Sequence, residues 1–203
     1  MEILTKEFTN HLLSMFVGND ELRESLNQYF TIDWLNKKWC CSTDAHSLII
    51  IPENEDNKLP EPKLRPPDAV RVIPEFSIDE KIDIADLKKQ YDDIEMVKNE
   101  LTDLCEACEG VGRFEHFDIW YDCETCDETG ESGTGVFEDV KNPDKHIVIG
   151  EALFAHFQIK RIIDVIDLTE SDELTLLSKG KHSTHLFKLN IGIYIISVPI
   201  NKF

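Results

Sequence analysis

Two Cys-x-x-Cys pairs, Cys105/Cys108 and Cys123/Cys126, constrain this chain more than any other feature. Fourteen residues separate the pairs, and glycines follow both of them. A Zn²⁺ ion prefers four soft ligands at tetrahedral corners, about 2.3 Å away, and one Cys-x-x-Cys turn supplies two of them. We therefore predict one structural Zn²⁺ ion bound by all four thiolates. Because a closed shell of four sulfurs leaves no position for water, we expect no catalysis at the metal.

Two other interpretations of these cysteines are a pair of disulfides and a redox dithiol. A redox Cys-x-x-Cys usually opens a helix after a buried strand, whereas acidic, glycine-containing hairpins are expected here. Disulfides are typical of small secreted domains, yet the opening sequence MEILTKEFTN has neither the basic nor the apolar segment of a secretion signal. We therefore favour zinc and expect a cytoplasmic protein.

The acidic charge of the chain is concentrated around the cysteines. The formal net charge is −19, and the stretch from Gln90 to Val140 holds 16 Asp and Glu residues against only Lys98 and Arg113. Such a segment should be repelled by phosphate backbones and attracted to basic proteins. A solvated acidic face that only aids solubility is an equally good interpretation.

The two ends of the chain show the same order of predicted elements. Length and a hydrophobic content of 41% are compatible with one sizeable core plus a small module, and no apolar run is long enough to span a membrane. Both ends predict strand, helix and three strands, an α+β fold with a repeat of about 55 residues. In the first half we expect an extended stretch over Glu2–Phe8, a helix from Thr9 or Asn10 to Gly18 that buries Leu12, Leu13 and Phe16, and strands over Leu26–Ile32, Lys38–Ser42 and His46–Ile51. In the second half we expect an extended pair over His146–Ile149 and Ala152–Ala155, a helix over Gln158–Leu168, and strands over Glu173–Ser178, His182–Leu189 and Ile191–Pro199.

The middle of the chain separates these halves. Six of the eight prolines lie between Pro52 and Phe76, which predicts an extended connection along the surface. Ser77 and Glu80 have the spacing of a capping box, and apolar residues recur at helical spacing from Ile84, predicting one helix or two up to Leu104. We therefore expect one domain formed by residues 1–51 and 142–203, a Pro-rich connection over 52–83, and an insert over 84–141 that contains a helix and the zinc hairpin.

Three short segments resemble the bacterial sliding clamp, the β subunit of DNA polymerase III. Residues 39–48, WCCSTDAHSL, resemble the "atDghrl" strand-turn-strand of that family, and residues 193–200, IYIISVPI, resemble its "yvimPv" last strand. Residues 154–160, FAHFQIK, are similar to the entry into its second helix. The resemblance covers about 110 residues in two blocks. It implies a single DNA-clamp-like domain of two βαβββ halves, whose helices would face DNA in a ring.

The cysteine segment separately resembles the zinc-binding repeat of DnaJ-type chaperones. Cys105 to Gly112 matches CxxCxGxG fully, whereas Glu128 replaces the first glycine of the second repeat. Nothing resembles the J domain of those chaperones, so the resemblance implies only a zinc knuckle. A bacterial clamp chain carries three clamp domains and this chain carries one, so a ring would need about six copies meeting edge to edge.

These patterns favour a non-enzymatic protein. We find no nucleophile motif, phosphate-binding glycine loop or supported carboxylate pair. If the second helix faces DNA, Lys160 and Arg161 are the candidate contacts to phosphates, without sequence specificity; an ordinary solvated helix face is the simpler interpretation. Our leading hypothesis is a sliding-clamp-like accessory of DNA replication or repair, with replication proteins, weakly bound double-stranded DNA and copies of itself as partners, and with no membrane or small-molecule substrate. The alternative is an adaptor whose acidic insert binds a basic protein or mimics DNA.

Overall fold

A computed structural model of the chain describes residues 4–19, 22–116, 119–179 and 184–200. The chain divides into two compact units. We call residues 1–93 together with 144–203 the sheet unit, and residues 94–143 the ribbon unit. In the described part of the chain, no helix has both the length and the apolar character needed to cross a membrane.

One antiparallel sheet of seven strands joins the two ends of the chain. The two halves meet where β3 pairs with β13, with Leu48 opposite Ile196 and Ile50 opposite Tyr194. The strands, in spatial order, are β1 (Phe30–Trp34), β2 (Lys37–Thr43), β3 (Ser47–Pro52), β13 (Tyr194–Ser197), β12 (His185–Leu189), β11 (Leu174–Lys179) and β4 (Glu80–Ile82). A strand is found in each of the six predicted stretches, and the halves meet at their last strands. Strands β2, β3 and β11 agree with the prediction to within one residue at each end, whereas β12 and β13 begin three residues later than predicted, and residues 182–183 lie outside the described part of the chain.

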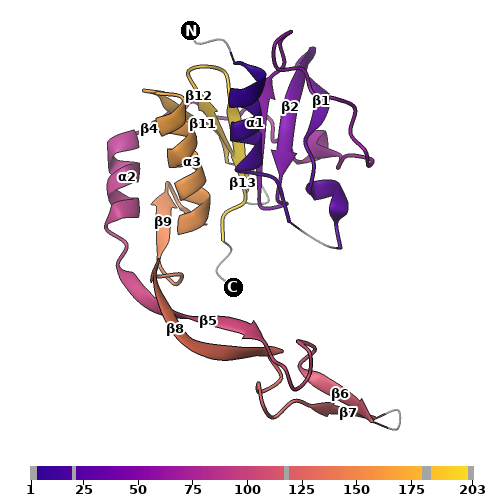
Figure 1. Ribbon diagram of the computed structural model, residues 1–203. Coiled ribbons are helices and arrows are strands. Elements are labelled where there is room, and N and C mark those ends of the chain that lie inside the picture. The colour runs from indigo at the N-terminus through magenta and orange to yellow at the C-terminus, as the bar shows by residue number, and fades with distance from the viewer. Residues whose placement is uncertain (1–3, 20–21, 117–118, 180–183, 201–203) are drawn as a thin grey trace. The chain divides into compact units, whose positions relative to one another are not determined.

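Two helices cover the same face of this sheet (Figure 1). The first, α1 (Lys6–Ser14), is capped by the Thr5 hydroxyl and buries Leu12 and Leu13, with Phe16 just beyond its end. The second, α3 (His156–Leu168), follows the hairpin of β9 (His146–Ile149) and β10 (Ala152–Ala155). Four isoleucines recur at helical spacing along α3 and are all buried: Ile159, Ile162, Ile163 and Ile166. The isoleucine stripe of the sequence thus marks the core-facing side of the helix.

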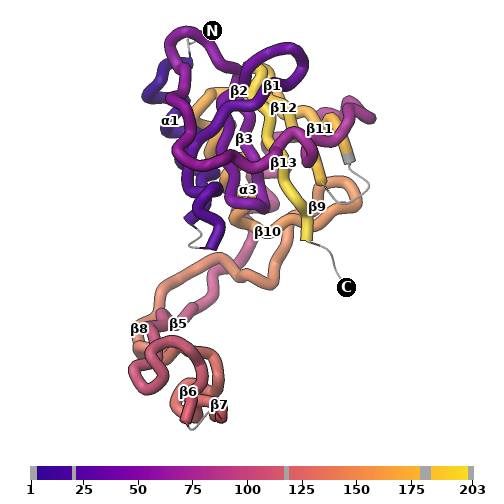
Figure 2. The backbone as a smooth tube through the Cα atoms, turned by 90° about the vertical axis from the view of Figure 1, so that its right-hand side faces the viewer, coloured from indigo at the N-terminus to yellow at the C-terminus, as the bar shows by residue number. Residues whose placement is uncertain are grey.

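The opposite face of the sheet is covered by the Pro-rich connection. Residues 53–76 pass from the helix-covered face around to the other side (Figure 2). There Ala69, in the short 3₁₀ helix Ala69–Val72, and Ile73 pack against Leu48, Ile50 and the other residues of one apolar cluster. The ring of Phe76 stacks on Tyr194 with centroids 6.3 Å apart. Because both faces are covered, the four apolar residues 48–51 of β3 are all buried.

Three predictions near element ends are wrong, and the first is the end of the first helix, which lies at Ser14 rather than at Gly18. Lys6–Phe8 is helical rather than extended, because Thr5 caps the helix earlier than predicted; residues 1–3 lie outside the described part of the chain. The strand predicted from Leu26 begins only at Phe30, after a 3₁₀ turn over Glu24–Leu26. No local pattern distinguishes these alternatives, since the first-half helix keeps its apolar face either way.

The predicted capping box at Ser77 and Glu80 is also wrong. Residues 80–82 form β4, which pairs with β11 and adds a seventh strand to the sheet. The helix α2 (Ile84–Asp92) begins instead after Asp83, whose carboxylate accepts hydrogen bonds from the backbone N–H groups of Ala85 and Asp86. This helix belongs to the sheet unit and contacts α3.

The ribbon unit contains strands where the sequence predicted helix. The helix predicted up to Leu104 ends at Asp92, and residues 96–104 form β5 (Met96–Leu104), which pairs with β8 (Glu131–Lys141). Two further strands, β6 (Arg113–His116) and β7 (Ile119–Asp122), form a hairpin. Among the described residues of this unit, only Ile94, the four cysteines, Gly112 and Gly130 are buried. The ribbon unit therefore has no extended apolar core in its described part.

Candidate metal centre

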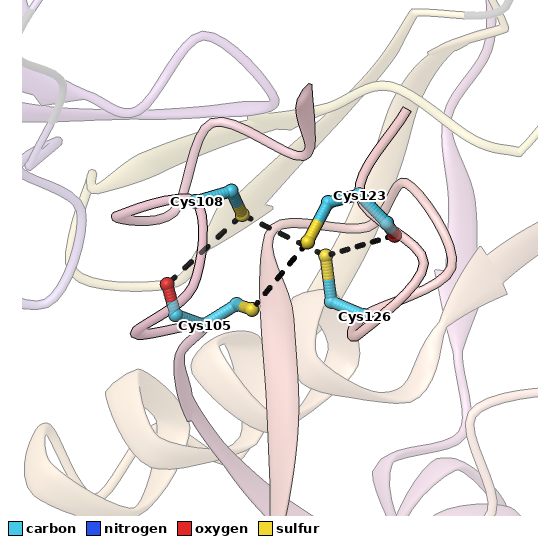
Figure 3. Close-up of side chains that lie close together, drawn as sticks. All are labelled: Cys105, Cys108, Cys123 and Cys126. Atoms are coloured by element: carbon cyan, nitrogen blue, oxygen red, sulfur yellow. Dashed lines mark hydrogen bonds between the residues drawn. The ribbon is translucent and has the colours of Figure 1, made fainter. Parts of the chain in front are cut away.

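The four predicted cysteine ligands come together in the ribbon unit (Figure 3). All four Sγ atoms lie within 4.8 Å of one another, and each side chain is at most 7% exposed. The Sγ atoms of Cys105 and Cys123 are 3.9 Å apart, and those of Cys108 and Cys126 are 3.7 Å apart. A disulfide requires about 2.05 Å between sulfurs, so the cysteines are free thiols and the disulfide interpretation does not describe this structure.

Two of the sulfur–sulfur separations match the edge of a tetrahedron of sulfurs around a metal ion. Ligands at about 2.3 Å from a central Zn²⁺ are separated by about 3.8 Å along each edge of the tetrahedron. The two measured separations differ from this value by about a tenth of an ångström. Sulfur ligands in a tetrahedral arrangement are typical of Zn²⁺ and of iron–sulfur centres. The cluster is therefore able to hold a metal ion.

Two equivalent loops, residues 105–112 and 123–130, position these sulfurs. In the first loop the backbone N–H of Gly112 donates to Cys108 Sγ at 3.2 Å, and in the second that of Gly130 donates to Cys126 Sγ at 3.2 Å. The loops also exchange backbone hydrogen bonds, from Cys105 N–H to Gly130 O at 2.8 Å and from Cys123 N–H to Gly112 O at 2.9 Å. Each loop thus stabilises its own thiolate and holds the other loop in place.

The glycines of the motif are required by close backbone approach. A Cβ atom on Gly112 would lie 2.2 Å from the carbonyl oxygen of Glu128, and one on Gly130 would lie 2.3 Å from that of Gly110. Glu128 occupies the position that Gly110 has in the first loop, with a positive φ of 67°. The second loop therefore forms the same turn as the first, but with a side chain in a conformation that favours glycine.

The surroundings shift the pKa values of two of the thiols, Cys123 and Cys126, in opposite directions. Burial alone would raise the pKa of the Cys123 thiol, but hydrogen bonds from the backbone N–H groups of Cys126 and Thr125 outweigh it and lower this pKa to about 7. Burial, together with the neighbouring thiols, raises the pKa of Cys126 to about 11. Metal binding therefore has to displace protons from this cluster, and acid should oppose it.

The two residues proposed to contact DNA lie on α3 of the sheet unit and form ion pairs within the chain. Arg161 pairs with Asp44, and the two side chains are 26% and 14% exposed. The Arg161 guanidinium also lies 5.8 Å from the ring centroid of Phe16 and 5.9 Å from that of Phe157. Lys160 pairs with Asp164 one turn along the helix. Because 117 residues separate Asp44 from Arg161, no local sequence pattern indicates this ion pair.

The surface beside Lys160 carries charges of both signs. A cavity of about 240 Å³ between α2 and α3 is lined by Tyr91, Ile163 and five charged residues: Lys88, Asp92, Lys160, Asp164 and Asp167. Lys88 pairs with Asp167, and so joins the two helices. Three carboxylates against two ammonium groups leave this face without a positive excess.

Comparison with known proteins identifies the fold. No family model matches the sequence, and no curated protein matches it either. Solved structures that resemble the chain include the β sliding clamp of C. crescentus (16% identity, TM-score 0.52), the DNA polymerase III β subunit of Thermotoga maritima (17%, 0.51) and that of Borrelia burgdorferi (13%, 0.53). The matches cover 96%, 96% and 100% of this chain and 64% of each clamp.

These likenesses establish a sliding-clamp-like fold, as the three sequence segments predicted. The chain spans about two thirds of the length of the clamps that it resembles. At identities of 13–17%, the comparison describes the arrangement of helices and antiparallel strands and does not extend to the activity.

Proposed function

We propose that this chain is a non-enzymatic accessory protein of DNA replication or repair that uses a clamp-like sheet unit as its scaffold. The proposal is carried by the likeness to the DNA polymerase III β subunits named above. It includes association with replication proteins and with copies of the same chain, and weak, salt-dependent contact of Lys160 and Arg161 with duplex DNA. Because both residues already pair with aspartates, we expect this affinity to be low.

Association of copies would involve the ends of the sheet. The terminal strands are β1 and β4, since β4 covers the outer edge of β11. A ring joined edge to edge would therefore pair β1 of one copy with β4 of the next. Light scattering over a range of concentrations, together with retention on closed circular DNA, tests this version. A strict monomer that is not retained on circular DNA would exclude the ring.

We propose further that Cys105, Cys108, Cys123 and Cys126 bind one structural Zn²⁺ ion in a knuckle similar to that of DnaJ-type chaperones. The sulfur separations and the paired N–H···S hydrogen bonds support this assignment. Bound zinc would supply a cross-link between the two loops rather than a reaction centre. Elemental analysis of freshly purified, reduced protein should give one zinc per chain, and protein without metal would contradict the assignment.

A second candidate function is that of an adaptor whose ribbon unit binds a basic protein. Residues 94–143 contain 14 Asp and Glu residues against three Lys and Arg residues. Almost half of the large apolar side chains that the structure exposes also lie in this short unit. Acidic surface with exposed apolar groups suits a basic, partly apolar protein better than a nucleic acid. Replacing residues 96–141 by a short turn should abolish capture of basic peptides and leave the sheet unit folded.

A further inference from the structure

The hairpin of β6 and β7 exposes apolar side chains that the metal site does not use. It connects the two cysteine loops but contributes no ligand. Phe114 is 39% exposed, Ile119 54%, Trp120 55% and Tyr121 51%. A hairpin without a core under it would ordinarily carry polar side chains here, since exposed apolar patches mark interaction sites. The exposed apolar residues therefore indicate a surface that binds another molecule.

The strand register assigns these side chains to the two faces of the hairpin. Phe114 is opposite Tyr121, and His116 is opposite Ile119, so these four share one face. On the other face Trp120 is opposite Glu115, and Asp122, two residues from Trp120, is opposite Arg113. Trp120 thus lies next to two carboxylates on the same face.

One cation–π contact shows what this face is able to bind. The guanidinium of Arg113 lies 5.5 Å from the centroid of the Trp120 ring. Among the described residues, the carboxylates of Glu115 and Asp122 take part in no ion pair. A cation from a partner would therefore meet an aromatic ring and two carboxylates that have not been neutralised.

The charge of the ribbon unit selects the partner. With 14 acidic residues against three basic ones, the unit repels phosphate backbones and attracts positively charged protein segments. We propose that the β6–β7 hairpin docks a Lys/Arg-rich protein segment, with Trp120 as the anchor and Glu115 and Asp122 as flanking carboxylates. This inference deepens the adaptor function and depends on it, because it assigns the binding to one face of one hairpin.

Fluorescence anisotropy of the zinc-loaded full chain with labelled deca-arginine tests the proposal at physiological ionic strength. We expect Trp120→Ala to weaken binding about tenfold. The double variant Glu115→Gln/Asp122→Asn should weaken binding by more than Trp120→Ala does. Phe137→Ala is the matched control, because Phe137 is an equally exposed aromatic residue on β8, at 55%, and should bind as the unchanged chain does. Arg113→Ala should bind two- to threefold more tightly, on the order of half a kcal/mol of cation–π competition removed. Zinc content, measured for every variant, reports whether the cysteine loops are intact.

Several outcomes would overturn the proposal. Equal binding by Trp120→Ala and the unchanged chain would reduce the interaction to diffuse charge attraction, and so would equal weakening by Phe137→Ala. Failure to bind deca-arginine, or tighter binding of single-stranded DNA than of deca-arginine, would also refute it. If replacing residues 96–141 abolishes peptide capture while Trp120→Ala does not, the adaptor function stands and only the hairpin assignment fails. If that replacement leaves capture unchanged, both fail.

Discussion

The sheet unit and the ribbon unit of this protein are stabilised by different means. The sheet unit buries apolar residues on both faces of a seven-stranded sheet, under α1 and α3 on one side and the Pro-rich connection on the other. The described part of the ribbon unit buries little besides four cysteines and two glycines. A two-stranded ribbon alone is marginally stable in water. Apolar burial accounts for the stability of the sheet unit, and the metal ion that we propose would supply the stabilisation that the ribbon unit lacks.

Loss of one of the four clustered cysteines should have the largest effect on the ribbon unit. Cys108→Ser should remove the metal and disorder the ribbon unit, because structural zinc contributes roughly 10–16 kcal/mol of apparent binding free energy in small peptides. Hydrogen exchange should then show loss of protection in residues 94–143 and unchanged protection in the sheet strands. Cys41→Ser is the matched control, since Cys41 is fully buried in the sheet unit. It should lower the stability of that unit by about 1–3 kcal/mol and leave the zinc content unchanged. A ribbon unit that stays protected in Cys108→Ser would contradict the comparison.

Removing buried apolar volume should destabilise the sheet unit more than the ribbon unit. Ile50 is fully buried on β3, so Ile50→Ala should lower the free energy of unfolding by about 2–5 kcal/mol. Val136 on β8 is 56% exposed, so Val136→Ala should change the free energy of unfolding by no more than about 0.5 kcal/mol. Denaturant unfolding monitored by tryptophan fluorescence measures both. Similar losses in the two variants would mean that the ribbon unit also depends on apolar burial.

The ion pair between Asp44 and Arg161 should make the stability of the sheet unit depend on pH. Burial alone would raise the pKa of Asp44, but the Arg161 guanidinium and nearby backbone N–H groups outweigh it and lower the pKa. A lowered carboxyl pKa contributes stability above its unfolded value, about 3.9, and this contribution is lost as the pH falls through the folded value. Asp44→Asn should therefore cost about 1–3 kcal/mol at neutral pH.

The Asp44→Asn effect should also shrink below about pH 4, because the unchanged protein then loses the same interaction. Asp164→Asn is the control for position on the surface. Asp164 forms a more exposed pair with Lys160, and its loss should cost no more than about 0.5 kcal/mol. Thermal melts at several pH values measure both differences. An Asp44→Asn effect that stays constant down to pH 3 would show that the charge of Asp44 is not its cause.

The smallest expected effect concerns the turn at Glu128. Because Glu128 has a positive φ of 67°, Glu128→Gly should relieve backbone strain and stabilise the metal-bound ribbon unit by about 1 kcal/mol. Competition with a chelator should show metal binding several times tighter. Glu124→Gly, which alters the same loop without a positive φ to relieve, should not strengthen binding. Weaker binding by Glu128→Gly would mean that the second loop has adapted to its side chain.

The sequence predicted most of the sheet unit because its signals are local. Apolar runs and turn residues located β2, β3 and β11 to within one residue at each end, and the helical spacing of apolar residues located α3. The predictions failed where a partner lies far away in the chain. Nothing near residues 96–104 indicates strand, because β5 is defined by pairing with β8 about thirty residues later. Residues 80–82 likewise become a strand only because β11 offers them an edge.

The candidate metal site shows the same division. The spacing and chemistry of Cys105, Cys108, Cys123 and Cys126 indicated the ligand set from the sequence alone, because a Cys-x-x-Cys turn and its glycines are a local device. The sequence alone did not indicate whether the side chains of Lys160 and Arg161 are free to contact phosphates. Their aspartate partners became evident only when α3 was packed in the structure.

The strands and helices of the two halves, the cluster of four cysteines and the position of the acidic charge could all be inferred from the sequence alone, apart from the strand expected before α1. Each of these depends on residues within a few positions of one another. Three features became evident only in the folded protein: the two halves join through β3 and β13, the Pro-rich connection covers a sheet face, and Arg161 pairs with Asp44. These features depend on side chains and edges from distant segments, and their free energies arise only when the whole unit folds.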